Sequence, residues 1–222
     1  MSNSIKTLLD IFNYIIQQHP EFTQNINLPG SPSVTEDLQR WAARGYSAPS
    51  PDSVKRACIL RNSLPNATWV ETGTYLGDTT EELAKIGKHV YSLEPDLHLY
   101  ENAKNRFGSF HNVSIINSTS EDYFPKLVNI LNNDACFWLD GHFSGESTYK
   151  GPNDTPIVIE LNHIKDALKN LNKVVIMVDD IRLFTGEVHS YGPYPKIDYL
   201  VKWALEAGLD WHIEQDIFIA KN

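Results

Sequence analysis

Three carboxylates follow two apolar runs of the chain, at positions where they could act on a ligand together. Asp140 follows the run 136–139, and Asp179 and Asp180 follow the run 174–178. If these runs are neighbouring parallel strands, they lie ~4.7–4.9 Å apart and bring the three acids to one edge of a sheet. Carboxylates this close repel one another, so one of them takes up a proton or a cation joins them.

Two kinds of cation could join these acids. A hard divalent ion such as Mg²⁺ suits an all-oxygen site that keeps open water positions. Alternatively, Arg182 or Lys150 neutralises the acids by ion pairing and no metal is needed. His142 lies at the same strand end, where an imidazole could take the proton from an acceptor hydroxyl, or could act only as a hydrogen-bonding loop residue.

A second candidate group lies between a predicted strand and a predicted helix. Gly73 lets the backbone pass close to a ligand, and Gly77 permits tight packing where the helix begins. Glu94 ends the next strand and could accept two hydrogen bonds from a ribose diol in the same crevice. The dinucleotide fingerprint is absent, and Glu71, ahead of the glycines, would suit an ammonium or sulfonium charge. Alternatively, the glycines only shape a turn and Glu71 caps a helix.

These residues resemble the first motif of class I S-adenosylmethionine-dependent methyltransferases, an acid followed by spaced glycines. Glu71, Gly73 and Gly77 match it, while Tyr75 replaces the middle glycine. The resulting form E-x-G-x-x-x-G-x-S/T is similar to metal-dependent O-methyltransferases, including those that act on antibiotic sugars (the macrocin and novobiocin type). The resemblance covers roughly residues 60–222.

The resemblance implies S-adenosylmethionine as the cofactor. Glu71 and the backbone of residues 73–77 would hold its methionine end, Glu94 its ribose hydroxyls, and the end of the third strand would lie by its adenine. The residues assigned to the cofactor are Glu71, Gly73, Thr74, Tyr75, Gly77, Thr79, Glu94, Pro95, Ser118, Thr119, Ser120 and Asp140. For the third strand end, the alternative is that Ser118 or Ser120 only caps the following helix.

The resemblance also implies metal and acceptor chemistry. Leu139-Asp140-Gly141 and Asp179-Asp180 match the metal-ligand patterns of that group, which implies Mg²⁺ on these three aspartates, although His142 stands where the group usually has another acid. The run W-L-D-G-H-x-S-x-x-x-T-x-K-G over residues 138–151 resembles methyltransferases of bacterial surface-glycan synthesis. It implies an O-methyltransferase with Asp140 and His142 as catalytic residues and a sugar, nucleotide-sugar or glycan precursor as acceptor.

The elements that must position these residues follow from hydrophobic periodicity. Strands are predicted at 68–70, 89–93, 113–116, 136–139 and 174–178, with helices at 79–86, 97–107, 121–131, 157–171 and 196–207. Two closing strands, 211–214 and 217–220, are too close in sequence for a crossover helix and must be antiparallel. The fold class is α/β, a doubly wound, mostly parallel seven-stranded sheet with an antiparallel last strand.

An N-terminal helical extension precedes this sheet. Residues 1–65 are predicted to form it, with helices at 4–18, 33–41 and 50–64, and residues 66–222 to form the Rossmann-like domain. The apolar face of residues 5–16 must be buried, either on its own domain or in a homo-oligomer.

Composition limits the partners and the compartment. The 222 residues include 19 Lys and Arg against 28 Asp and Glu, a net charge of −9, which argues against nucleic acid and anionic membrane surfaces. No apolar stretch reaches the ~18–20 residues of a membrane span. With two cysteines there is no disulfide framework, so we expect a cytoplasmic protein. Two other functions stay open: a nicotinamide-dependent oxidoreductase on the same fold and a non-catalytic cofactor-binding assembly subunit.

Overall fold

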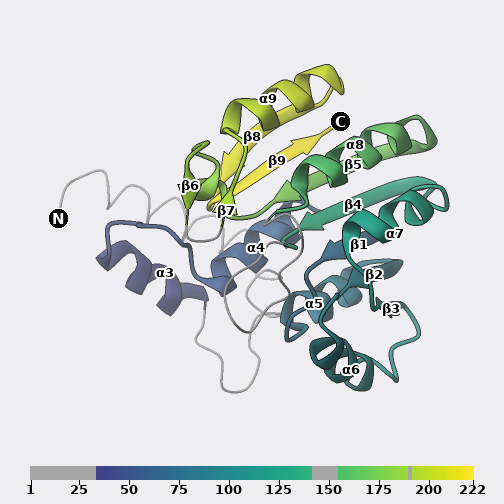
Figure 1. Cartoon of the computed structure of the whole chain (residues 1–222). Coiled ribbons are helices and arrows are strands. Elements are labelled where there is room, and N and C mark those ends of the chain that lie inside the picture. The colour runs from purple at the N-terminus through teal and green to yellow at the C-terminus, as the bar shows by residue number, and fades with distance from the viewer. Residues whose placement is uncertain (1–33, 142–154, 190–191) are drawn as a thin grey trace. The chain divides into compact units, whose positions relative to one another are not determined.

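The computed structural model describes residues 34–141, 155–189 and 192–222 (Figure 1). The chain divides into two compact units, residues 1–57 and 58–222. Helix α4 (Asp52–Asn62) contains the point of division. The predicted helix at 4–18 lies outside the described residues, and the predicted domain boundary after residue 65 stays a prediction.

The described part of the first unit contains helix α3 (Val34–Ala43), close to the predicted 33–41. Acidic residues in its first turn and a basic residue in its last turn complement the helix dipole. After the helix, the Trp41 Nε1 donates a hydrogen bond to the Ser47 carbonyl at 2.7 Å, and the Tyr46 ring packs edge-on against Trp41 at 5.2 Å. These contacts fix the chain where it leaves α3.

The second unit is built on a seven-stranded sheet. Its strands are β1 (Thr68–Thr72), β2 (His89–Leu93), β3 (Val113–Ile116), β4 (Asn133–Leu139), β5 (Leu171–Val178), β8 (Asp210–Glu214) and β9 (Ile217–Lys221). Their order across the sheet is β3-β2-β1-β4-β5-β9-β8, and β9 runs antiparallel to both of its neighbours. The predicted fold class is therefore confirmed.

The strand order reverses between β1 and β4. The chain proceeds from β1 outward through β2 to β3, then returns to place β4 on the other side of β1. In open α/β sheets, ligands bind beyond the carboxyl ends of the strands at such a switch point. The residues that follow β1 and β4 are therefore the first to consider as a site.

Helices cover both faces of the sheet (Figure 1). The helices of this unit are α5 (Asp78–Ile86), α6 (Leu97–Arg106), α7 (Ser120–Leu127), α8 (Ile157–Ala167) and α9 (Ile197–Glu206). One core buries Phe124 of α7, Leu161 of α8 and Trp203 of α9 against one face. The other core buries Leu83 of α5 and Ile59 against the opposite face. Burial on both faces explains the continuous apolar runs of the inner strands.

Several boundaries differ from the sequence-based expectation, and two of them lie between α8 and β5. Strand β5 begins at Leu171, three residues before the predicted start, because the exposed polar residues Asn172 and Lys173 separate Leu171 from the apolar run. The predicted helix 157–171 ends at Ala167 and continues as the short 3-10 helix η1 (Leu168–Asn170).

The segment between β5 and α9 contains a small antiparallel pair. Its strands are β6 (Val188–His189) and β7 (Gly192–Pro193), and the 3-10 helix η2 (Ile181–Leu183) precedes them. Two-residue strands carry no periodic signal, which is why the sequence did not indicate them. No helix among the described residues is long and apolar enough to cross a membrane.

Candidate active site

The chain after β1 meets the chain after β4 in a close backbone contact. Thr72 and Leu139 are register partners, and the Asp140 N–H donates to both the carbonyl and the Oγ1 of Thr72 at 3.2 Å. Gly73 follows with φ +85°, and a Cβ at this position would lie 2.6 Å from the Asp140 carbonyl oxygen. Glycine is therefore required here both for its backbone conformation and for space.

The glycine turn between β1 and α5, residues 73–77, is held against Glu94. The Tyr75 N–H donates to Glu94 Oε2 at 2.9 Å, and the Asp96 N–H donates to Oε1 at 3.0 Å. Burial raises the pKa of Glu94, and these two N–H bonds oppose the shift. The turn and Glu94 thus lie together, as the sequence predicts for a shared crevice. Their roles toward a cofactor stay predictions.

Glu71 is fully buried behind the turn. The Thr80 and Ser92 hydroxyls both donate to its Oε2 at 2.5 Å, while Oε1 is buried with no hydrogen-bond partner among the described residues. Ser92 has one hydroxyl proton and gives it to Glu71, so Thr74 must donate the 2.6 Å bond that joins it to Ser92. This chain of hydroxyls links the turn to β2 and α5 through one carboxyl.

Burial raises the pKa of Glu71 to about 7, against the lowering effect of the Ser92 and Thr80 hydrogen bonds. The carboxyl is therefore half protonated near neutral pH. Helix α5 begins after Gly77 without a side-chain cap, so the alternative in which Glu71 caps a helix is wrong. Sequence analysis missed Thr80 and Ser92, because nothing in their spacing indicates that they point at one carboxyl.

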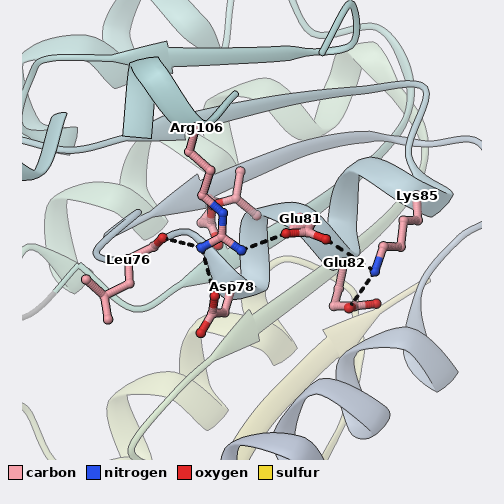
Figure 2. A network of polar contacts seen from close by, with 8 residues as sticks. Leu76, Asp78, Glu81, Glu82, Lys85 and Arg106 are labelled. Carbon is pink, nitrogen blue, oxygen red and sulfur yellow. Dashed lines mark hydrogen bonds and ion pairs between the residues drawn. The ribbon is translucent and has the colours of Figure 1, made fainter. Parts of the chain in front are cut away.

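The glycine turn is also contacted by Arg106, the last residue of α6. Arg106 donates to the Leu76 carbonyl at 2.5 Å, to Asp78 Oδ1 at 2.8 Å and to Glu81 Oε2 at 2.6 Å (Figure 2). Beside it, a Cβ on Gly77 would lie 2.7 Å from the Phe107 ring. Figure 2 shows that Lys85 extends the network along α5 through Glu82 and Glu81. Sequence analysis assigned Arg106 no role, because a basic residue in the last turn of a helix is ordinary.

The third strand end joins the same region through Asn117. Its Nδ2 donates to the Glu94 carbonyl at 2.9 Å, which connects the ends of β2 and β3. Helix α7 is capped by Thr119, whose Oγ1 accepts the Asp122 N–H at 3.3 Å. The alternative in which Ser118 or Ser120 caps this helix is therefore wrong. The prediction that these residues lie by an adenine stays a prediction.

The acids after β4 and β5 gather at the same edge of the sheet. The Asp179 N–H donates to the Leu139 carbonyl at 3.1 Å, and β5 ends at Val178. Asp180 has a left-handed backbone with φ 57°, which turns the chain at the end of β5. Asp179 and Asp180 are buried, and Asp140 is half-buried.

Asp180 forms an ion pair with Arg182, whose Nη1 lies 2.6 Å from Asp180 Oδ1. Arg182 also pairs with Asp216 in the turn between β8 and β9. Burial would lower the pKa of Arg182, but its bonds to the two aspartates outweigh burial and raise the pKa. This is the ion-pairing alternative of the sequence analysis, with Asp216 as a partner that the sequence did not indicate.

The residues as placed do not fit the predicted Mg²⁺ site. Within the described ranges, no group of three or more His, Cys, Asp or Glu side chains is arranged to hold a metal ion. The Asp180 carboxylate is engaged by a guanidinium instead. Lys150 and the predicted base His142 lie outside the described residues. Metal at Asp140, Asp179 and Asp180 therefore stays a prediction without support from this arrangement.

A narrow cavity of about 10 Å³ opens beside these acids. Glu160 is 2% exposed, and its Oε1 lies 3.6 Å from the position of a Cβ on Gly141. The lining residues are Leu139, Gly141, Thr155, Pro156, Ile157, Glu160, Val178, Asp179, Phe184 and Tyr194. Glu160 was missed as a site residue. A signal existed, since it lies on the same helical face as the apolar residues 157, 161 and 164.

No family model and no curated protein matches this chain. Among solved structures, it is similar to a putative methyltransferase from Streptococcus mutans in complex with SAH, at 15% identity and a TM-score of 0.45, covering 79% of this chain and 98% of that one. It is also similar to the N-methyltransferase NodS from Bradyrhizobium japonicum, at 14% identity and a TM-score of 0.49, covering 75% and 92%. A third is an rRNA methylase from Streptococcus thermophilus, at 16% identity and a TM-score of 0.44, covering 79% and 95%.

Similarities at this level say nothing about what this chain binds. NodS is named as an N-methyltransferase and the Streptococcus thermophilus protein as an rRNA methylase, whereas the name of the Streptococcus mutans protein gives no acceptor. The expected absence of nucleic-acid partners stays a prediction.

Proposed function

We propose that this chain is an S-adenosylmethionine-dependent methyltransferase that acts on a hydroxyl group of a sugar or glycan precursor. One observation carries the proposal. At the switch point between β1 and β4, a left-handed glycine turn lies directly against the buried carboxylate that ends β2. The backbone groups of the turn, and a carboxylate that can accept hydrogen bonds from a diol, thus lie where an open α/β sheet binds ligands.

The residues fit a cofactor that carries a ribose and a positive charge. Glu94 would hold the ribose hydroxyls, because each of its oxygens accepts only one bond from the described backbone and keeps a further lone pair. Glu71 Oε1, buried without a partner among the described residues, would accept a bond from the cationic methionine end. Bound S-adenosylmethionine supplies an electrophilic methyl group on a sulfonium centre.

Exposed apolar side chains next to this site suit a nucleoside base. Tyr75 and Leu76 in the turn are 47% and 56% exposed, and Leu97 at the start of α6 is 63% exposed. A flat base can cover such surface while its ribose reaches Glu94. These residues supply contact area for the base.

The acceptor side lies at the ends of β4 and β5. Asp140 and Asp179 place carboxyl groups there, and the 138–151 run resembles that of surface-glycan methyltransferases. We propose His142 as the base that takes the hydroxyl proton and Asp140 as a group that orients the acceptor. Because methyl transfer is an in-line displacement, positioning is the main task of these residues.

Calorimetric titration with S-adenosylhomocysteine, beside NADH, tests the cofactor assignment. We expect micromolar binding of the former alone. Replacing Glu94 by Gln should weaken that binding about 10- to 100-fold, since a charge-assisted bond to a diol contributes roughly 1.5–3 kcal/mol. The matched control is Glu101→Gln, an exposed glutamate of α6, which should bind normally. Binding of NADH alone, or of neither ligand, would contradict the proposal.

An assay of methyl transfer to sugar acceptors tests the acceptor assignment. Purified protein with radiolabelled S-adenosylmethionine should label a nucleotide-sugar or glycan precursor through an oxygen atom, and His142→Ala should abolish the labelling while S-adenosylhomocysteine still binds. Labelling of an amine or of RNA in place of a sugar would be consistent with the proposed cofactor but would contradict the proposed sugar acceptor.

A further inference from the structure

The strand end that carries Asp180 already contains a cation supplied by the chain. Arg182 lies between Asp180 and Asp216 and bonds to both carboxylates through Nη1. The Asp180 and Asp216 side chains are 9% and 7% exposed, so two nearly buried carboxylates share this one guanidinium. A nearby cation favours the ionised form of such carboxyl groups, and arginine keeps its charge at any physiological pH.

The β8–β9 hairpin holds Arg182 in this place. Gln215 and Asp216 form its two-residue turn with φ 54° and 67°, the left-handed pair that tight hairpins require. Because Val178 pairs with Phe218, the turn lies at the end of β5. There the Asp216 carbonyl accepts the Ile181 N–H at 3.0 Å, and Asp216 Oδ1 accepts the Arg182 N–H at 3.0 Å.

Asp216 thus contacts Arg182 in two ways, through the backbone N–H and through the guanidinium. The contact with the backbone N–H fixes the main chain at Arg182, and the contact with the guanidinium fixes the far end of the side chain. A guanidinium held at both ends loses little freedom when it pairs with Asp180. The β8–β9 hairpin therefore holds Arg182 in position to pair with Asp180.

We infer that the Arg182 guanidinium takes the place of a divalent metal at this strand end, so that methyl transfer by this chain needs no metal, and that Asp216 is the residue that positions Arg182 for this purpose. The inference rests on the proposed function for its catalytic meaning. A dication would have to share the Asp180 carboxylate with a guanidinium 2.6 Å away, and the like charges repel.

Binding of Mn²⁺ to the full chain, followed by electron paramagnetic resonance, tests this inference without any methyl transfer. The wild-type chain should show no site tighter than about 1 mM, weaker than carboxylate sites built to hold a divalent ion. Arg182→Met should create a site at least about tenfold tighter, because it removes the guanidinium that Asp180 and Asp216 share. Arg182→Lys retains a positive charge and should again exclude Mn²⁺.

The matched control is Arg106→Met. Arg106 also bridges two acids, Asp78 and Glu81, but Asp78 is 63% exposed and water can solvate its charge. This variant should not bind Mn²⁺. If Arg182→Met does not fold, as judged by its thermal unfolding, Asp216→Asn replaces it, because it loosens Arg182 and keeps the shape of the turn.

Tight Mn²⁺ binding by the wild-type chain, lost in Asp180→Asn, would overturn the inference. A folded Arg182→Met chain that still excludes Mn²⁺ would also overturn it, because Arg182 would then not be what excludes the metal. If S-adenosylhomocysteine fails to bind at all, the proposed function fails, but the Mn²⁺ result still decides which cation belongs to this strand end. Where transfer is observed, its rate should be unchanged in EDTA.

Discussion

Two halves of one sheet edge hold their functional groups by different means. On the β1–β2 side, the Glu94 carboxylate is fixed by two backbone N–H groups, and the glycine turn is fixed by a backbone contact with Asp140. On the β4–β5 side, Asp180 is fixed by a side-chain ion pair that depends on a hairpin from the end of the chain.

This difference sets how each half responds to change. Backbone contacts survive most side-chain substitutions and depend on the few residues that permit the backbone path. Ion pairs depend on the charge of each partner. The β1–β2 half should therefore be most sensitive at its glycines, and the β4–β5 half at its charged residues.

The largest effect is expected from Gly73→Ala. The added Cβ would lie 2.6 Å from the Asp140 carbonyl oxygen, in a backbone conformation with φ +85° that favours glycine. Binding of S-adenosylhomocysteine should fall at least about 100-fold, and the free energy of unfolding should drop by about 3 kcal/mol, because strain and overpacking add. Calorimetry and urea unfolding measure the two effects.

The control for this variant is Gly208→Ala. Gly208 also has a positive φ of +70°, but an added Cβ would meet nothing within 4 Å. It should cost only about 1 kcal/mol of stability, the usual penalty for a left-handed alanine, and leave binding unchanged. If both variants lost stability and binding equally, the close contact between Gly73 and the Asp140 carbonyl would not be the cause of the loss.

A change in stability that depends on pH is expected from Glu71→Gln. The folded-state pKa of Glu71 is raised from 4.5 to about 7, so the folded chain binds this proton more tightly than the unfolded chain does. The stability that comes from the proton is complete below pH 4.5 and is lost as the pH rises through about 7. Glu71→Gln removes this dependence. The free energy of unfolding of the variant, relative to that of the wild type, should therefore rise by about 3 kcal/mol between pH 4 and pH 8.

Urea unfolding across this pH range measures the difference between the two chains. Glu101→Gln, on the exposed surface of α6, should follow the wild type at every pH. A constant difference between Glu71→Gln and the wild type would mean that Glu71 does not titrate in this range.

The smallest effect is expected from Arg106→Met. Arg106 is 35% exposed and binds the Leu76 carbonyl at the outer side of the glycine turn (Figure 2). Exposed ion pairs contribute little, so the stability should change by less than about 1 kcal/mol. Binding of S-adenosylhomocysteine should weaken about 3- to 10-fold, because the turn is less well ordered before binding.

Arg61→Met is the control, since Arg61 pairs with Glu214 away from the turn. It should match Arg106→Met in stability and the wild type in binding. If both variants bind like the wild type, the turn does not depend on its outer contact.

The sequence by itself determined the fold and where along the chain the candidate site residues lie. The predicted limits of β2 and β3 agree with the structure, because apolar runs bounded by turn residues are a local signal. The spacing of Gly73 and Gly77, and the acids that follow four strands, likewise placed the candidate groups at one edge of the sheet. His142, the predicted base, lies outside the described residues and stays a prediction.

Only the tertiary structure decided which partner each of these groups has. The sequence left open whether Asp180 meets a metal or an arginine, and it gave no sign that Asp216 would hold that arginine. It also assigned Glu71 to the cofactor, but it did not indicate that the fold buries this carboxyl and that Thr80 and Ser92 donate to its Oε2. Periodicity reports which face of an element is buried, but the register of a distant hairpin and the depth of a carboxyl depend on how all the elements pack.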